Sequence, residues 1–167
     1  MNARKATPLA EINLLVLDVD GVLTDGQLYF SDKGETLKVF NVRDGHGIKL
    51  LMGSGVEVAA ISGRRSGAVA ARMRELGVGR VVQGCADKVA ALRRLTKQLD
   101  IDPLSCACMV DDTADLPLMS AVGFAAAVAD AHPLVMSAAH WVAKAAGGRG
   151  AVRELCDALL RARAGGR

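Results

Sequence analysis

The sequence predicts an α/β fold in which a Rossmann-like parallel sheet is covered by helices on both faces. Short apolar runs of strand length recur along the chain, and segments with helix-like spacing of apolar residues separate them. This alternation is typical of parallel sheets, because their crossover connections place helices on both faces. One strand–turn–strand segment interrupts the alternation and predicts a β-hairpin inserted after the first strand.

The expected strands are aliphatic or alanine-rich runs at 14–17, 56–61, 81–82, 106–110 and, more weakly, 123–128. The segment 87–99 has the clearest helical pattern, with apolar residues spaced by three and four. The other expected helices are 47–53, 66–76, 116–121, 133–137 and 151–162. The fold is therefore a sheet of at least five strands with a helix between most of them.

Length and composition predict one domain at 14–162, flanked by a flexible N-terminal tail, 1–13, and a C-terminal tail, 163–167. The net charge is only +3 and the basic residues are scattered, which argues against nucleic-acid binding. No apolar run approaches the ~20 residues that span a bilayer, so we expect no membrane association. The four cysteines lack metal-site spacing and are expected to be buried thiols, which fits a cytoplasmic protein.

The hairpin insertion, 27–42, contains Tyr29, Phe30 and Phe40, which are three of the five aromatic residues of the chain. An isolated two-stranded hairpin is marginally stable in water, and aromatic residues are enriched at interfaces. We therefore predict that the hairpin packs against other subunits. The alternative is that it folds back on its own domain.

Two carboxylates, Asp18 and Asp20, leave the aliphatic strand 14–17 and are followed by Gly21. Residues two apart in a strand share a face, so the acids are expected to point the same way. Paired carboxylates repel, and a divalent cation relieves that repulsion. Gly21 permits a sharp turn that lets the following amides face an anion. The combination predicts phosphoryl transfer through an aspartyl-phosphate, whereas the alternative is a strand end with exposed acids.

Three further polar groups lie at expected strand ends or helix starts. Ser62 follows the second strand, Lys88 begins the helix 87–99, and Asp111 and Asp112 follow the strand 106–110. A hydroxyl, an ammonium group and a helix start all favour a bound phosphoryl group. Taken singly, Lys88 is an ordinary surface lysine. Asp115 is as well suited to capping the next helix, whose start Pro117 marks, as to catalysis.

Together these features resemble the haloacid dehalogenase superfamily of aspartate-nucleophile phosphatases. Within it, the chain resembles the subfamily that acts on 3-deoxy-D-manno-octulosonate 8-phosphate (KDO 8-phosphate), in lipopolysaccharide precursor biosynthesis. The resemblance extends from about residue 14 to residue 160. It rests on the segments DVDGVLTDG (18–26), NVRDG (41–45), ISGR (61–64), DDTADLP (111–117) and GGRGAVRE (147–154).

The resemblance implies that Asp18 is the nucleophile and that Asp20 protonates the leaving oxygen and then activates water. It implies that Asp18, Asp111 and the backbone carbonyl of Asp20 bind Mg2+, an oxygen-preferring cation. Ser62 and Lys88 would bind the phosphoryl oxygens.

In the same resemblance, Gly21 belongs to the phosphate-binding loop, and Asp112 and Asp115 support the metal site. The insertion 27–42 is too small for a separate cap domain, so a capless homotetramer assembled through the hairpins is implied. The residues expected to contact the sugar acid are Asn41, Arg43, Asp44 and Arg64, the arginines being suited to a carboxylate.

Three alternatives remain. A related phosphatase could act on a nine-carbon, sialic-acid-type 9-phosphate. A phospho-accepting receiver domain also combines Asp, Ser or Thr, and Lys, although the acid pair on the first strand argues against it. Val110 stands where the family usually has glycine, and a β-branched residue restricts the backbone there. That departure motivates the third alternative, an inactive binding subunit, although the metal-binding acids remain and activity is expected.

Overall fold

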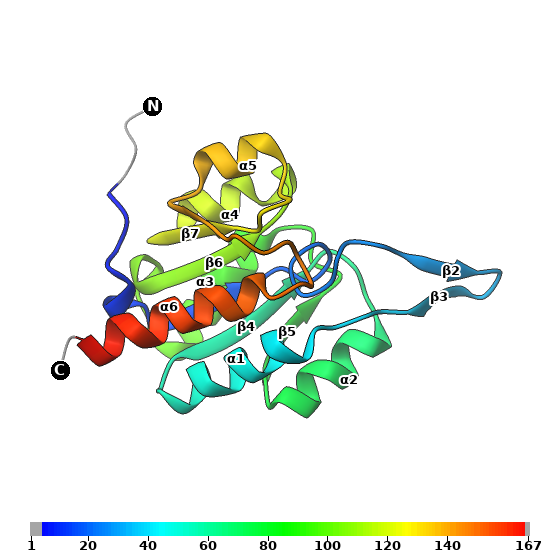
Figure 1. The fold of residues 1–167 in the computed structure, drawn as a ribbon, viewed down its shortest axis with the longest axis horizontal. Coiled ribbons are helices and arrows are strands. Elements are labelled where there is room, and N and C mark those ends of the chain that lie inside the picture. Colours follow the sequence, from blue (N-terminus) through cyan, green and yellow to red (C-terminus); the bar gives the residue numbers. More distant parts are fainter. Residues whose placement is uncertain (1–4, 166–167) are drawn as a thin grey trace.

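Six parallel strands form one sheet, in the order β5-β4-β1-β6-β7-β8, in the computed structural model, which describes residues 5–165 (Figure 1). The predicted parallel sheet is thereby confirmed. Strand β8 was not predicted, because a strand of two residues carries no periodic signal. The strands are β1 (Leu14–Leu17), β4 (Glu57–Ser62), β5 (Arg80–Gln83), β6 (Cys106–Val110), β7 (Phe124–Ala127) and β8 (Trp141–Val142).

The helices form two groups. Helix α1 packs against α2 and α6, whereas α4 packs against α3 and α5. Right-handed crossovers between parallel strands place such groups on opposite faces of a sheet. The helices are α1 (Val42–Gly53), α2 (Gly67–Leu76), α3 (Lys88–Leu99), α4 (Leu116–Ala121), α5 (Pro133–Ala138) and α6 (Ala151–Gly165). None of the helices within residues 5–165 is long and apolar enough to cross a membrane.

Helix α1 begins at Val42, earlier than residue 47 where the apolar pattern predicted its start. The side chain of Asn41 caps it by accepting a hydrogen bond from Arg43 N at 2.8 Å. Glycine lowers helix propensity, which obscured this first turn in the sequence. At Gly47 a Cβ would press on the side chain of Arg153, so glycine here permits the close approach of α1 and α6.

Residues 5–13 are packed rather than frayed, which corrects the expected tail over that part of 1–13. Thr7 N donates to Gly123 O at 2.9 Å, and Ile12 is fully buried beside a short 3-10 helix, η1 (Leu9–Glu11). At the other end α6 continues past residue 162, and Arg163 Nη1 donates to Ile12 O at 2.9 Å. Residues 1–4, 166 and 167 of the expected tails lie outside the described residues.

The predicted hairpin forms a separate two-stranded sheet from β2 (Tyr29–Ser31) and β3 (Gly34–Leu37). It extends away from the body of the molecule (Figure 1). Tyr29 and Phe30 of β2 are exposed, and so are Leu37 and Val39 on the returning side. Phe40 instead packs partly against the core. The hairpin therefore does not fold back on the sheet of its own domain.

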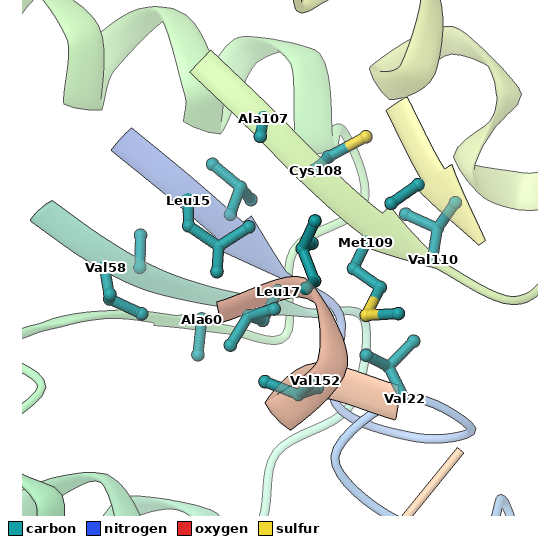
Figure 2. Packing of buried hydrophobic residues seen from close by; sticks show 14 of the residues in the cluster. Leu15, Leu17, Val22, Val58, Ala60, Ala107, Cys108, Met109, Val110 and Val152 are labelled. Carbon is teal, nitrogen blue, oxygen red and sulfur yellow. The ribbon is translucent and has the colours of Figure 1, made fainter. Parts of the chain in front are cut away.

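The core is aliphatic and alanine-rich, and it reaches the loop that follows β1. Figure 2 shows Val22 of this loop near Leu17 and Met109, with Val152 of α6 to the left of Val22. Val110, the departure from the family pattern, is completely buried and pairs regularly with Ala127 of β7. Its side chain belongs to the core, so the strand that carries the second acid pair is undistorted at this position.

Candidate active site

The predicted acids lie at the carboxyl edge of the sheet, next to its central strand. Leu17, the last residue of β1, pairs with Ala60 of β4 on one side and Met109 of β6 on the other. Between β1 and β6 the strand order reverses direction. Ligands of open α/β sheets bind at such a switch point, outside the carboxyl ends of the strands. Asp18 and Asp111 leave β1 and β6 at this point.

Three carboxylates and one ammonium group meet there. One carboxylate oxygen from each of Asp18, Asp111 and Asp115 lies within 4.8 Å of the others. Lys88 Nζ, at the start of α3, lies 2.8 Å from Asp18 Oδ1 and donates to Asp115 Oδ2 at 2.9 Å. Lys88 is therefore a half-buried partner of the acids and not an ordinary surface lysine. Asp115 makes no cap for α4, so the alternative structural role for this residue is wrong.

The acid cluster is short of positive charge. Burial, and then the charges of Asp18 and Asp115, raise the pKa of Asp111 to about 7. Burial, followed by the charge of Asp18, also raises the pKa of Asp115, although Lys88 opposes the rise. Burial alone would lower the pKa of Lys88, but the charges of Asp18 and Asp115 outweigh it and raise that pKa. One lysine cannot neutralise three carboxylates, so the cluster attracts a further cation.

These residues fit a divalent, oxygen-preferring cation. Asp115 Oδ1 is buried and accepts no hydrogen bond from a described residue, although Lys88 Nζ lies 2.7 Å away. An unsatisfied buried oxygen costs free energy unless a ligand binds it. Mg2+ is bound by such carboxylate oxygens together with water. Asp18 and Asp111 were predicted as ligands, whereas Asp115 was predicted only to support the site, and its oxygen belongs to the same cluster.

The loop after β1 is folded tightly around Gly21 and Thr24. Gly21 has φ +88°, and a Cβ there would overlap the carboxylate of Asp111. The amides of Gly21 and Gly26 donate to the buried hydroxyl of Thr24, at 3.3 and 3.2 Å. The amides of Val22, Leu23 and Thr24 all donate to Val19 O. The prediction that the amides after Gly21 face an anion is therefore wrong, because this turn uses them internally.

A glycine-rich segment, residues 147–150, closes the far side of this loop. Gly148 N donates to Val22 O at 2.9 Å, and a Cβ at Gly147 would overlap the carbonyl of Gly21. The side-chain Nδ2 of Asn41 donates a hydrogen bond to Gly148 O at 3.2 Å. Because its side-chain oxygen also caps α1, Asn41 has a structural role in place of the free side chain expected for a contact with the sugar.

Asp44, also expected to contact the sugar, is buried against the start of α6. It is 1% exposed, and its Oδ1 accepts a hydrogen bond from Arg153 N in the first turn of α6 at 2.8 Å. Asp44 thus caps α6 from the neighbouring helix, a position that favours negative charge. Its predicted role as a substrate ligand is corrected to this structural one.

The remaining predicted residues lie around the acid cluster or near the hairpin. Ser62 is buried at the end of β4, and its Oγ accepts a hydrogen bond from Arg64 N at 3.1 Å. Asp112 is exposed and caps the 3-10 turn η3 (Thr113–Asp115) through Thr113 N at 2.6 Å. Arg43 is exposed. Arg64 lies 3.4 Å from Glu35 and over the Phe30 ring, at 5.8 Å from its centre.

Asp20 pairs with a lysine that the sequence patterns did not single out. Its Oδ1 binds the ammonium group of Lys38, which follows β3 of the hairpin. Lys38 Nζ also lies 3.2 Å from Glu35 Oε2. No local motif marks Lys38, because it lies eighteen positions after Asp20, on the far side of both hairpin strands. Its place within the predicted hairpin, next to the acid pair, was the one available signal.

This fold and this cluster define the class of haloacid dehalogenase-like hydrolases. The model of that family matches residues 74–155. The 3-deoxy-D-manno-octulosonate 8-phosphate phosphatase KdsC of Escherichia coli (strain K12) is 50% identical over 151 residues, which are 90% of this chain and 80% of that protein.

Two solved structures are similar throughout. The phosphatase of the same description from Yersinia pestis has a TM-score of 0.92 at 47% identity, covering 94% of this chain and 85% of that one. The Moraxella catarrhalis phosphatase, a complex with magnesium ion, phosphate ion and KDO, has a TM-score of 0.91 at 38% identity, with coverages of 94% and 90%. The chain belongs to the haloacid dehalogenase-like hydrolases, in the family of the KDO 8-phosphate phosphatases.

Proposed function

We propose that this protein is a Mg2+-dependent phosphatase that hydrolyses KDO 8-phosphate to KDO and inorganic phosphate, in the biosynthesis of lipopolysaccharide precursors. The observation that carries the proposal is the Asp18 carboxylate, held by Lys88 within an acid cluster at the switch point of the sheet. The membership of the family and the KDO bound by the Moraxella relative support the substrate.

The proposed reaction has two steps. A carboxylate oxygen of Asp18 attacks phosphorus, the bond from phosphorus to the sugar oxygen breaks, and Asp20 gives that oxygen its proton. Asp20 then removes a proton from water, which attacks phosphorus and frees Asp18 together with inorganic phosphate. Proton transfer of this kind contributes about 10²–10⁴-fold to the rate.

The phosphoryl oxygens meet donors of this chain. Lys88 supplies an ammonium group, and the Ser62 hydroxyl keeps its hydrogen because its oxygen accepts from Arg64 N. The amides of Val19 and Asp20 donate to no acceptor among residues 5–165, so they are available as well. Mg2+, held by Asp18, Asp111, Asp115 and the carbonyl of Asp20, would supply the positive charge that offsets the phosphoryl charge.

Two arginines are proposed to recognise the sugar acid. Arg64 follows Ser62, one of the phosphate donors, and contacts Glu35 of the hairpin. Arg43 is exposed and directly follows the hairpin insertion, 27–42. A guanidinium group binds a carboxylate with two parallel hydrogen bonds, which suits the acid group of KDO.

Assembly through the hairpin and a cytoplasmic location remain proposals. The hairpin projects from the body and exposes aromatic and aliphatic side chains that a lone protomer leaves in water. Contiguous exposed apolar surface of this kind marks interfaces between subunits. We propose a homotetramer in which the hairpins assemble together and a neighbouring subunit helps to cover each site.

The test is a phosphate-release screen with sugar phosphates and Mg2+, using the wild-type protein and Asp18→Asn. KDO 8-phosphate is expected to have the highest kcat/KM, and Asp18→Asn is expected to release no phosphate. Preference for a nine-carbon 9-phosphate would reassign the substrate. Turnover retained by Asp18→Asn would contradict the nucleophile, and a stable acyl-phosphate without turnover would favour a receiver domain. Binding of Mg2+ without phosphate release would favour the inactive subunit that Val110 suggested.

A further inference from the structure

The hairpin sends one residue, Lys38, into the active site, and no step described above uses it. Its side chain is only 1% exposed, although it follows two strands whose residues are half-buried or exposed. The ammonium group binds Asp20 Oδ1 and lies 3.2 Å from Glu35 Oε2. Lysine is almost never buried without a paired charge, because the loss of hydration is large. Two carboxylates fix the position of this one.

The contact selects one oxygen of Asp20. Lys38 engages Oδ1, and no residue within 5–165 donates a hydrogen bond to Oδ2. The side chain of Asp20 is 21% exposed, so it keeps an open side. A carboxyl held by one oxygen presents the other in a fixed direction. The two acids of the pair are therefore handled separately, Asp18 by Lys88 and Asp20 by Lys38.

Glu35 ties this contact to the rest of the hairpin. Its Oε2 lies 3.2 Å from Lys38 Nζ and 3.4 Å from Arg64 Nη2. The pKa of Glu35 is lowered, first by hydrogen bonding with Ser66 and then by Lys38 and Arg64. Burial opposes this effect but does not outweigh it. Glu35 is therefore anionic at neutral pH and is the second carboxylate beside the Lys38 ammonium group.

We infer that Lys38 is a positioning residue that holds Asp20 by one carboxyl oxygen so that the other meets the leaving oxygen of the substrate. The inference rests on the proposed phosphatase function and adds a second lysine to it. The proton moves from Asp20 to the sugar oxygen as the bond between phosphorus and that oxygen breaks. Lys38 itself exchanges no proton and touches no reacting atom.

Substrates with different leaving groups distinguish a positioning role of Lys38 from a general structural role or a contact with the substrate. An alkoxide such as that of the sugar needs a proton as it leaves, whereas p-nitrophenolate leaves readily without one. Misplacement of Asp20 therefore slows transfer of the phosphoryl group from KDO 8-phosphate to Asp18. The rate of the same step with p-nitrophenyl phosphate stays nearly unchanged. A general distortion of the site slows both, and a lost contact with the substrate raises KM instead of lowering kcat.

The experiment compares wild type, Lys38→Met, Lys38→Arg and the control Lys33→Met, an exposed lysine of the same hairpin. For Lys38→Met we expect kcat on KDO 8-phosphate to fall by on the order of 10²-fold with KM nearly unchanged. The single-turnover burst of p-nitrophenol should change by less than about threefold, because that step requires no acid. Lys38→Arg should recover part of the loss, and Lys33→Met should match wild type.

Equal losses on both phosphates, a change confined to KM, or full activity of Lys38→Met would each overturn the inference. If wild type itself hydrolyses neither phosphate, the proposed function fails instead. Melting curves and sedimentation establish that each variant folds and assembles as wild type does. Should Lys38→Met not fold, Glu35→Gln removes one of the two carboxylates around the ammonium group and must show the same selective loss for the sugar phosphate.

Discussion

Lys88 Nζ lies 2.8 Å from Asp18 Oδ1, across a separation of seventy positions in the sequence. The two residues leave different elements, β1 and the start of α3, and meet only because both elements end at one edge of the sheet. This contact places a cation beside the proposed nucleophile and gives the site its first test.

Replacement of Lys88 by methionine should remove most of the activity. The ammonium group offsets charge on Asp18 and Asp115 and is proposed to bind the phosphoryl group. Loss of one such electrostatic donor lowers kcat by about 10²–10³-fold. Lys88→Arg should retain more activity than Lys88→Met in a phosphate-release assay. Equal activity of Lys88→Met and wild type would remove Lys88 from the site.

Binding of Mg2+ should weaken as the pH falls below neutrality. The pKa of Asp111 is raised to about 7 in the metal-free protein, so a proton competes with the metal below that pH. The dissociation constant should rise by about tenfold for each pH unit below 7, and about one proton should be released on binding. Calorimetry in two buffers of different ionisation enthalpy measures both. A dissociation constant that is the same at pH 6 and pH 8 would contradict the assignment.

Alanine at position 21 should destabilise the protein and disturb the metal site. Gly21 has φ +88°, and its missing Cβ leaves room for the Asp111 carboxylate. We expect Gly21→Ala to lower the free energy of unfolding by about 1–3 kcal/mol and to weaken Mg2+ binding. Gly53→Ala is the matched control, because a Cβ there meets nothing within 4 Å. Equal stability of the two variants would argue against the steric account.

Asp44 should make the protein less stable as the pH rises. Burial raises the pKa of Asp44, and the backbone hydrogen bonds of Arg153 and Gly150 offset only part of the rise. The folded protein therefore holds its proton at pH values where the unfolded chain, with a pKa of about 3.9, has released it. The stability advantage of wild type over Asp44→Asn should shrink between about pH 4 and the raised pKa. Urea unfolding at several pH values tests this, and an advantage that grows with pH would contradict it.

A charge introduced on the exposed face of the hairpin should dissociate the proposed homotetramer into dimers or monomers. Leu37 is 52% exposed and lies on β3. If hairpins pack together, Leu37→Glu buries an unpaired carboxylate at the interface, a change that costs several kcal/mol. Sedimentation of Leu37→Glu and of the control Lys33→Glu, in the exposed turn, measures the effect. The same mass for both variants and wild type would exclude Leu37 from an interface.

The residues whose place in the fold could be predicted carry local signals. Asp18 and Asp111 follow aliphatic runs, and the ends of neighbouring parallel strands meet whatever lies between them. Asp87 and Asn41 cap helices, but only Asp87 precedes an apolar pattern strong enough to mark its helix. Asn41 and Asp44 instead belonged to a recognisable motif, and their side chains also bind the backbone of Gly148 and Arg153, far along the chain.

The contact of Gly147 and Gly148 with the loop after β1 joins two segments that the ribosome makes at very different times. A ribosome makes Asp18 and Asp20 long before the backbone at Gly147 and Gly148 that braces their loop. A nascent chain that does not yet include this segment has every reactive side chain of the cluster but lacks the support for the loop between them. Such a chain would therefore be inert, and catalysis would begin only after the glycine-rich segment has been made and has folded onto the loop.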